Sequence, residues 1–442
     1  MKHSKYNLIT DIEGINFTVF NPLSGAFDVA DKQSIERFKK LEPQNEDEYN
    51  YWLKRGFVFE NELQEDEFIG KKNTEFNNEM NKSDTQFLIV PTYNCNFNCS
   101  YCYQKGIENT NLMTKPMIDN IIKYLIKYRE QVKPEFFVTI FGGEPLLDSP
   151  KQADLIRYLA SKLIENNIYY AVVTNGYEIL KFKDILVNNF VREVHITLDG
   201  DEQIHNKRRY TKNDNNSFAR IIDGMKYLTD NFIQVNLRII IDKQTMPTLP
   251  GLAEKLDNAG LLKKNKMIFK TSLGRNYELI DPHSGEELLY ELDEMYREFV
   301  KLMDKYPLVA QMHTPSFFGI KNIVEKKEAY LPSFDTCPAG KSEFVFDWSG
   351  NIYGCTASCG REGYEFGKFY PEVEFYTDKM KDWTQRSILT IPGCSDCSVA
   401  LLCGGGCGVI ANDRNGTPLS KNCKPVKEVV DIGIKYFKSK IL

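Results

Sequence analysis

The sequence of 442 residues predicts an α/β protein built around a parallel sheet, and three observations lead there. Apolar runs of strand length recur six times after residue 85, helical segments with 3.6-residue apolar spacing lie between them, and turn residues close several of the runs. Right-handed crossovers between such strands give either an α/β barrel or an open, doubly wound sheet. In both arrangements the chemistry belongs at the carboxyl ends of the strands.

The expected strands of this sheet are short and regularly spaced, at residues 87–90, 136–141, 168–173, 193–198, 235–241 and 267–270. Helices are expected between them, most clearly at 115–130 and 218–228, and a long helical segment at about 285–305 leads out of the sheet. After Pro332 the periodicity fades, and Cys, Gly and Pro dominate. We therefore expect an α/β domain over residues 86–310 and a Cys-rich domain over 311–442.

Residues 1–85 have a different pattern and predict a small α+β unit. Strand-like runs at 16–20 and 27–29 flank a turn, helices are expected at 32–41 and 46–54, and a short strand closes the unit at 56–59. The stretch 61–84 starts like a helix but does not sustain an apolar period, which predicts a linker.

Composition excludes several classes of protein. Lys and Arg number 56 against 61 Asp and Glu, for a formal net charge of -5, and no clusters mix basic and aromatic residues, so nucleic acid is not an expected partner. The longest apolar runs are too short to span a bilayer, and no apolar secretory segment follows the first residues. The expectation is a cytoplasmic protein without a membrane partner.

The cysteines are unevenly distributed. Eight of the 11 lie from Cys337 onward, in the last 106 residues, and the five histidines are not spaced as paired zinc ligands. In a reducing compartment dense cysteines are metal ligands or catalytic thiols before they are disulfides. Thiolate chemistry is therefore the expected theme.

A compact cysteine motif follows the first expected strand, with Cys95, Cys99 and Cys102 separated by three and then two residues. Three thiols on one loop leave one iron of a 4Fe-4S cluster without a protein ligand, whereas structural zinc normally takes four ligands. With Tyr101 before the last cysteine, this spacing resembles the radical S-adenosylmethionine (SAM) enzymes. The resemblance implies a partial (β/α)6 TIM-like barrel, and an open iron that binds SAM and cleaves it to a 5'-deoxyadenosyl radical.

Further motifs stand at the ends of the next strands. Gly142-Gly143-Glu144-Pro145 ends the second strand, where glycines allow close backbone approach to a ligand, and it resembles the family motif that holds the methionyl ammonium. The third and fourth strands end in turn dipeptides that could serve the backbone alone. By resemblance, the SAM-binding candidates are Tyr101, Gly142, Gly143, Glu144, Pro145, Asn175, Thr197, Asp199, Arg209 and Arg238; the two arginines could equally be structural.

The late cysteines have the seven-cysteine spacing of the SPASM extension found on radical enzymes that mature ribosomal peptides and proteins. The resemblance implies two auxiliary 4Fe-4S clusters, the first on Cys337, Cys355 and Cys407 and the second on Cys394, Cys397, Cys403 and Cys423. Cys359 is either the fourth ligand of the first cluster or a spare buried thiol, and without it an iron would be open to substrate. The rival interpretation is a pair of zinc sites.

The resemblance implies an oxidoreductase that abstracts a hydrogen atom from a precursor peptide with a leader segment, using an external electron donor such as flavodoxin or ferredoxin. A thioether or carbon-carbon cross-link is favoured over formylglycine formation, because sulfatase-maturing relatives carry an Asp where this chain has Thr356. The amino-terminal unit also resembles winged-helix peptide-recognition domains, although a capping domain without a ligand would look alike. The alternatives are peptide epimerisation, an activating enzyme, an RNA-modifying radical enzyme, against which the acidic charge balance argues, and a non-enzymatic zinc scaffold. No general base can be named.

Overall fold

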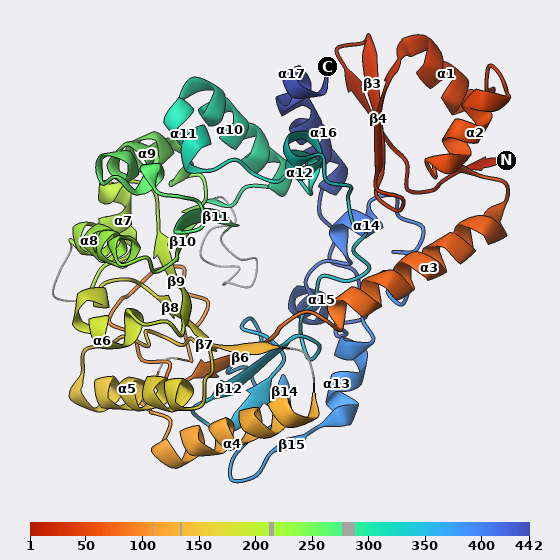
Figure 1. Cartoon of the computed structure of the whole chain (residues 1–442). Helices are drawn as coiled ribbons and strands as arrows, with labels where there is room; N and C mark the ends of the chain where they lie inside the picture. The colour runs from red at the N-terminus through yellow and green to blue at the C-terminus, as the bar shows by residue number, and fades with distance from the viewer. Residues whose placement is uncertain (108, 133–134, 212–215, 276–287) are drawn as a thin grey trace.

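The computed structural model describes residues 1–107, 109–132, 135–211, 216–275 and 288–442. Its architecture combines a curved sheet wrapped by helices with a small amino-terminal unit and a carboxyl-terminal Cys-rich region (Figure 1). Over the described residues, no helix is long and apolar enough to cross a membrane.

The central sheet has ten strands in the order β11-β10-β9-β8-β7-β6-β12-β13-β14-β15. Six parallel strands form its barrel part, namely β6 (Thr85–Val90), β7 (Phe136–Ile140), β8 (Tyr170–Thr174), β9 (Val191–Leu198), β10 (Val235–Ile241) and β11 (Phe269–Arg275). Consecutive strands are neighbours and the sheet does not close on itself. The expected partial (β/α)6 barrel is confirmed.

Helices cover the outer face of the barrel (Figure 1). They are α4 (Lys115–Gln131), α5 (Pro150–Glu165), α6 (Lys183–Leu186), α7 (Glu202–Arg208), α8 (Ser217–Asp230) and α9 (Leu249–Asn258), with single 3-10 turns at η1 (Ile179–Lys181), η2 (Met246–Thr248) and η3 (Leu261–Lys263). Several start signals lie in the sequence: the Thr114 side chain caps α4, and prolines occupy the first turns of α4, α5 and α9.

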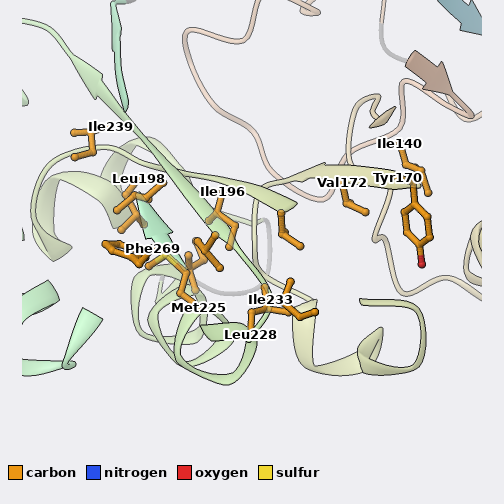
Figure 2. Packing of buried hydrophobic residues seen from close by; sticks show 14 of the residues in the cluster. Ile140, Tyr170, Val172, Ile196, Leu198, Met225, Leu228, Ile233, Ile239 and Phe269 are labelled. Carbon is orange, nitrogen blue, oxygen red and sulfur yellow. The ribbon is translucent and has the colours of Figure 1, made fainter. Parts of the chain in front are cut away.

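The two faces of the strands differ in polarity. On the outer face, strand residues such as Ile140, Val172 and Ile196 belong to one apolar core with Met225 and Leu228 of α8 (Figure 2). Burying each such side chain contributes about 1.5–3 kcal/mol. Residues alternate along a strand, so the neighbours of these residues face inward.

The carboxyl-terminal region extends the barrel sheet. Its first strand, β12 (Glu343–Asp347), pairs in parallel with β6, and β13 (Asn351–Tyr353), β14 (Glu365–Lys368) and β15 (Glu374–Phe375) follow as antiparallel strands. The helices of this part of the chain are α10 (Leu292–Lys305), α11 (Pro307–Met312), α12 (Ile320–Lys326), α13 (Thr377–Thr384), α14 (Ala400–Cys403), α15 (Gly408–Asn415), α16 (Val426–Tyr436) and α17 (Lys438–Ile441). The helix expected at 285–305 begins only at Leu292, because 288–291 are not α-helical, while 285–287 lie outside the described residues.

The amino-terminal unit is an α+β fold beside α16 and α17 (Figure 1). An antiparallel sheet contains β2 (Leu8–Ile12), β3 (Asn16–Asn21) and β4 (Ala26–Asp31), while β1 (Lys2–His3) pairs with β5 (Val58–Phe59). Helices α1 (Lys32–Lys40) and α2 (Glu46–Lys54) are capped by the side chains of Asp31 and Asn45.

The linker prediction for 61–84 is wrong for most of its length, because α3 (Glu62–Met80) occupies it. The Asn61 side chain caps this helix by accepting the Gln64 amide at 3.0 Å. Few side chains of α3 are buried, Ile69 among them, so the sequence shows only a weak apolar period. Tertiary contacts stabilise the helix instead, such as the ring pair Phe76–Phe334 at 5.8 Å.

Glu65 ties α3 to the first residues of the chain. Its side chain is 1% exposed, accepts hydrogen bonds from the Ser4 hydroxyl and the Lys5 amide at 2.9 Å each, and lies 2.7 Å from the Lys2 ammonium. Glu65→Ala should lower the free energy of unfolding of this unit by about 2 kcal/mol, because buried donors lose their acceptor. Denaturant titration measures the loss. The exposed Glu62→Ala on the same helix is the control, and equal stability of the two variants would contradict the expectation.

Candidate functional site

Three cysteines lie together on the loop that follows β6. Burial raises the pKa of the Cys95 thiol to about 12, and the Glu144 carboxyl adds to this increase. The Phe97 amide opposes it, while Cys99 and Cys102 make smaller contributions that raise it further. Burial also raises the pKa of Cys99 to about 11, against the opposing effect of the Arg209 cation. The three thiols are therefore within electrostatic reach of one another, at the carboxyl end of the first barrel strand.

The two glycines after β7 allow the chain to approach this loop closely. A Cβ on Gly142 would lie 2.5 Å from the Thr92 carbonyl oxygen, and one on Gly143 would lie 2.4 Å from the Asn94 carbonyl oxygen. Gly142 also has φ +149°, a conformation that favours glycine. The Gly143 amide donates to the Thr92 carbonyl at 3.0 Å. The two glycines were expected to allow close approach to a ligand. In the structure they allow close approach to the backbone at the start of the cysteine loop.

Glu144 is fully buried and organises the ends of two strands. Its carboxylate accepts the Asn175 amide at 2.6 Å, the Thr174 hydroxyl at 2.7 Å and the Leu146 amide at 2.8 Å. Burial raises its pKa to about 7, while these three donors act to lower it. A carboxylate has about four lone-pair sites, so one acceptor position remains for a ligand such as an ammonium group. Pro145 continues this turn, and its carbonyl accepts the Gln152 amide at 3.2 Å.

Asn175 connects the end of β8 to the cysteine loop. Its side-chain amide donates to the Asn96 side chain at 2.7 Å, one residue after Cys95. The amide of Tyr177 in turn donates to the Asn175 side-chain oxygen at 2.9 Å. The structure therefore brings Asn175, Glu144 and the cysteine loop together, as the strand order predicts for carboxyl ends of parallel strands.

A buried ionic network holds the far end of the loop. The Tyr101 hydroxyl donates to Asp199 at 2.6 Å and accepts from Arg209 at 2.6 Å. Arg208 bonds Asp199 at 3.0 Å and lies 2.6 Å from Asp242 at the end of β10. Asp199 and Arg209 are thus placed beside the thiols, but their charges are already largely paired within the protein.

Two members of this network, Arg208 and Asp242, escaped the sequence analysis. The signals were present: Asp242 directly follows β10, and Arg208 stands in the run His205-Asn206-Lys207-Arg208-Arg209 after β9. The buried His205 accepts the Asp199 amide at 3.2 Å, and its pKa is well below the usual value because of burial and then the cations Arg209 and Arg208. A neutral histidine therefore fixes the turn that carries Asp199.

The late cysteines form two groups. One group contains the four thiols expected on the second auxiliary cluster. The pKa of Cys394 is raised first by burial and then by Cys403, Cys423 and Cys397. Cys403 responds in the same way to burial and to Cys397 and Cys423, with the Lys424 cation opposing. Cys394 and Cys403 are thus within electrostatic reach of Cys397 and Cys423, the set of four that the resemblance implies for one auxiliary cluster.

The other group, expected on the first auxiliary cluster, surrounds Cys355. Burial raises the pKa of Cys355 to about 12, and the Glu343 carboxyl and the Cys337 thiol contribute after it. Cys407 belongs to this group because the next residue, Gly408, lies against Cys337. A Cβ on Gly408 would be 3.1 Å from the Cys337 sulfur.

Cys359 is placed differently from the other late cysteines. Its sulfur lies 2.9 Å from the Tyr93 hydroxyl, and its side chain packs in a separate buried cluster with Leu88, Val90 and Val345. The Tyr93 hydroxyl also donates to Asp347 at 3.1 Å. The Cys359 thiol is thus engaged by a residue two positions before Cys95. Burial raises the pKa of Cys359 well above its usual value, Asp347 adds to the increase, and Cys355 contributes less.

A buried arginine fixes the glycine-rich loop between the two groups. Arg386 is 1% exposed, and its guanidinium donates to the carbonyls of Gly405 at 2.5 Å, Ser420 at 2.7 Å, and Pro418. Burial raises the pKa of both Cys337 and Cys394, and the Arg386 cation opposes each increase. A single cation therefore faces both groups of thiols and opposes the charge that thiolates would bring.

An inner chamber of about 260 Å³ lies on the inward face of the barrel strands. Thr197 and Arg238, two of the expected SAM contacts, line it. Thr356, which follows Cys355, also lines the chamber. The complete lining is Gln86, Leu88, Tyr103, Thr139, Phe141, Val173, His195, Thr197, Arg238, Glu343, Thr356 and Ala357.

The cysteine groups fit iron-sulfur clusters in chemistry and surroundings. Each consists of thiols on loops or, for Cys403, at the end of a helix, with Arg209 near the first motif and Arg386 near both late groups. The Nε of Arg209 is buried without a hydrogen-bond partner, which leaves a donor beside the Cys95 loop. Over the described residues, no three His, Cys, Asp or Glu side chains are gathered around a single metal ion position.

Residues 89–256 match the radical SAM superfamily. The chain is 25% identical over 380 residues to a cysteine-type anaerobic sulfatase-maturating enzyme of Clostridium novyi, covering 80% of this chain and 96% of that one. The structure of anSMEcpe with bound AdoMet and Kp18Cys peptide is similar with a TM-score of 0.61 at 17% identity, over 80% and 97% of the two chains. Streptococcus suis SuiB bound to precursor peptide SuiA matches with a TM-score of 0.55 at 16% identity, over 96% and 99%.

The chain is therefore a radical SAM enzyme. In fold it resembles anSMEcpe over 80% of its length and SuiB over 96%, and both of those structures hold peptides. Membership in this superfamily overturns the alternative of a non-enzymatic zinc scaffold.

The contacts of Arg386 predict a strong dependence of the Cys-rich region on this residue. Arg386→Met should lower the free energy of unfolding by about 3 kcal/mol, because several buried carbonyls lose their donor. Thermal or denaturant unfolding measures the loss, and the exposed Lys381→Met on α13 is the control. Wild-type stability of Arg386→Met would show that the guanidinium is dispensable.

Proposed function

We propose that this enzyme matures a ribosomally made precursor peptide by hydrogen-atom abstraction, most specifically by forming a thioether or carbon-carbon cross-link. The observation that carries the proposal is the inner chamber, whose lining includes Tyr103, next to Cys102, and Thr356, next to Cys355. A peptide side chain in this chamber would lie between the loop that starts the radical reaction and a group of late thiols.

The residues have distinct roles in this proposal. Cys95, Cys99 and Cys102 would hold the first 4Fe-4S cluster, which together with SAM supplies a radical that removes one hydrogen atom from a substrate carbon. Glu144 offers its remaining acceptor position to the ammonium group of SAM, and Arg209 its unpartnered Nε–H to a carboxylate or ribose oxygen. The ionic network around Asp199 keeps the loop in place.

The late thiols would hold two auxiliary clusters that carry electrons away from the substrate. Cys394, Cys397, Cys403 and Cys423 supply a complete set of four ligands for one of them. Cys337, Cys355 and Cys407 serve the other, and the contact of Cys359 with Tyr93 favours a three-thiol set there. Reduction of the first cluster requires an external one-electron donor such as flavodoxin or ferredoxin.

The amino-terminal unit is suited to bind an extended leader segment. Among the described residues, β4 pairs only with β3 in the sheet, so its other edge is available for strand addition. A cavity of about 370 Å³ adjoins this edge and is lined by Phe27, Val29 and Ile323. The unit also touches the Cys-rich region, since the Tyr6 hydroxyl donates to the Ser395 carbonyl at 3.2 Å.

Formylglycine formation is the second candidate, because the curated relative from Clostridium novyi is a sulfatase-maturating enzyme. Thr356 weighs against it, since a threonine hydroxyl cannot replace the carboxylate that sulfatase-maturing relatives carry there as a base. Epimerisation is a third outcome of the same hydrogen abstraction. The mass of the product separates all three.

The product of the proposed reaction can be identified by mass spectrometry. Co-expression with the precursor peptide encoded beside the gene should yield a peptide that has lost two hydrogen atoms, with fragmentation blocked between the two linked residues. A peptide of unchanged mass with altered stereochemistry would mean epimerisation, and a formylglycine residue would mean the sulfatase-maturing reaction. Either result would contradict cross-linking.

The leader-binding role of β4 predicts a selective defect. Val29, 44% exposed, lies on the free edge strand, so Val29→Glu should weaken binding of the same precursor peptide by about tenfold, because it places a charge beside an apolar cavity. Fluorescence anisotropy of the labelled peptide measures this. Ile15→Glu, at the turn between β2 and β3, is the matched exposed control. Unchanged affinity of the Val29 variant would place the leader elsewhere.

A further inference from the structure

The wall of the inner chamber contains one carboxyl group that none of the sequence motifs includes. Glu343 is the first residue of β12, and among the described residues that line the chamber it is the only Asp or Glu. It enters the chamber because β12 joins the barrel sheet next to β6, with Glu343 opposite Gln86 in the register.

The position of Glu343 is fixed from the Cys355 side. Its Oε1 accepts the backbone amide of Thr356 at 2.9 Å, which orients the carboxyl group at the point where the Cys-rich loop meets the chamber. No other hydrogen bond to this carboxylate is found over the described residues. Most of its lone-pair sites therefore remain free for a group inside the chamber.

We propose that the Glu343 carboxylate is the catalytic base that takes the proton from the substrate group that forms the new bond. This deepens the proposed function and rests on it.

The other polar groups facing the chamber are less suited to this task. His195 is paired with Glu193 at 2.9 Å, Arg238 is a permanent cation, and Tyr103 carries a phenol, which accepts a proton poorly while it is neutral. Burial raises the pKa of Glu343 to about 7, against the opposing Thr356 amide. A base with a pKa near the working pH is the most effective in proton transfer.

The proposed step balances in atoms and electrons. A substrate C–H bond breaks first, and its hydrogen atom goes to the adenosyl radical derived from SAM, giving 5'-deoxyadenosine. The second substrate group, a thiol in the thioether case, then loses its proton to Glu343 as its sulfur bonds to the carbon radical. The remaining electron would be accepted by one of the auxiliary clusters that the late cysteines would hold. The peptide thus loses two hydrogen atoms in total.

The test compares Glu343→Gln with the wild type, using the iron-loaded full-length enzyme, SAM, dithionite and the precursor peptide encoded beside the gene. The amide keeps an acceptor for Thr356 but cannot take a proton. We expect 5'-deoxyadenosine to form at a rate close to wild type, while the ratio of cross-linked peptide to 5'-deoxyadenosine falls about 100-fold or more. Glu343→Asp should restore part of that ratio. The exposed Glu374→Gln on β15 is the matched control.

Two results would overturn the proposal. An unchanged ratio of product to 5'-deoxyadenosine in Glu343→Gln would exclude a base at this position. A loss of iron in both Glu343 variants would show that the carboxyl group only maintains the Cys355 loop. Failure of the proposed function is distinguishable from both, because the wild type itself would then leave the peptide without the loss of two hydrogen atoms.

Discussion

The pairing of β12 with β6 is the constraint on which the rest of the structure depends. Five residues of the Cys-rich region, Glu343–Asp347, continue the barrel sheet in parallel with Gln86–Val90. This pairing joins regions about 250 residues apart in sequence, and it sets Cys355 and Thr356 beside the same chamber as the loop of Cys102. The contact between the Tyr93 hydroxyl and the Cys359 sulfur at 2.9 Å joins the same two regions a second time.

The barrel separates apolar packing from chemistry by the simple alternation of strand residues. Outward side chains such as Ile196 and Leu198 form the core with the helices, while Thr197 between them faces the chamber. The strand ends then supply Glu144, Asn175 and Asp199, each bonded to the cysteine loop or its neighbours. The loop is therefore held by several strands at once, which suits a site that must keep a reactive species from solvent.

Buried cations accompany the thiols throughout. Arg208 and Arg209 lie beside the first loop, and Arg386 faces both late groups. Because thiolates and reduced clusters carry negative charge, such cations reduce the cost of placing that charge in a partly buried setting. The arginines are bonded to carboxylates or carbonyls, so their positions are fixed before any cofactor binds.

The sequence predicted those parts of the site that have a fixed local spacing. Cys95, Cys99 and Cys102, the Gly142–Pro145 turn and the late cysteines are all short-range patterns, and the strands before them are clear apolar runs. Glu343, Asp242 and Arg386 were missed because their roles arise from tertiary neighbours: a strand pairing, a charge pair between strand ends, and carbonyls of a distant loop. Helix α3 was missed for a similar reason, since caps and scattered contacts stabilise it without a regular apolar face.

The most direct test of this account is the cofactor content of two proteins purified without oxygen, the wild type and a Cys95→Ala, Cys99→Ala, Cys102→Ala triple variant. Iron, labile sulfide and zinc are measured alongside 5'-deoxyadenosine formation with SAM and dithionite. We predict roughly twelve irons per wild-type chain and roughly eight in the variant, which should form no 5'-deoxyadenosine. Zinc in the late cysteine groups, or cleavage of SAM by the triple variant, would contradict the account.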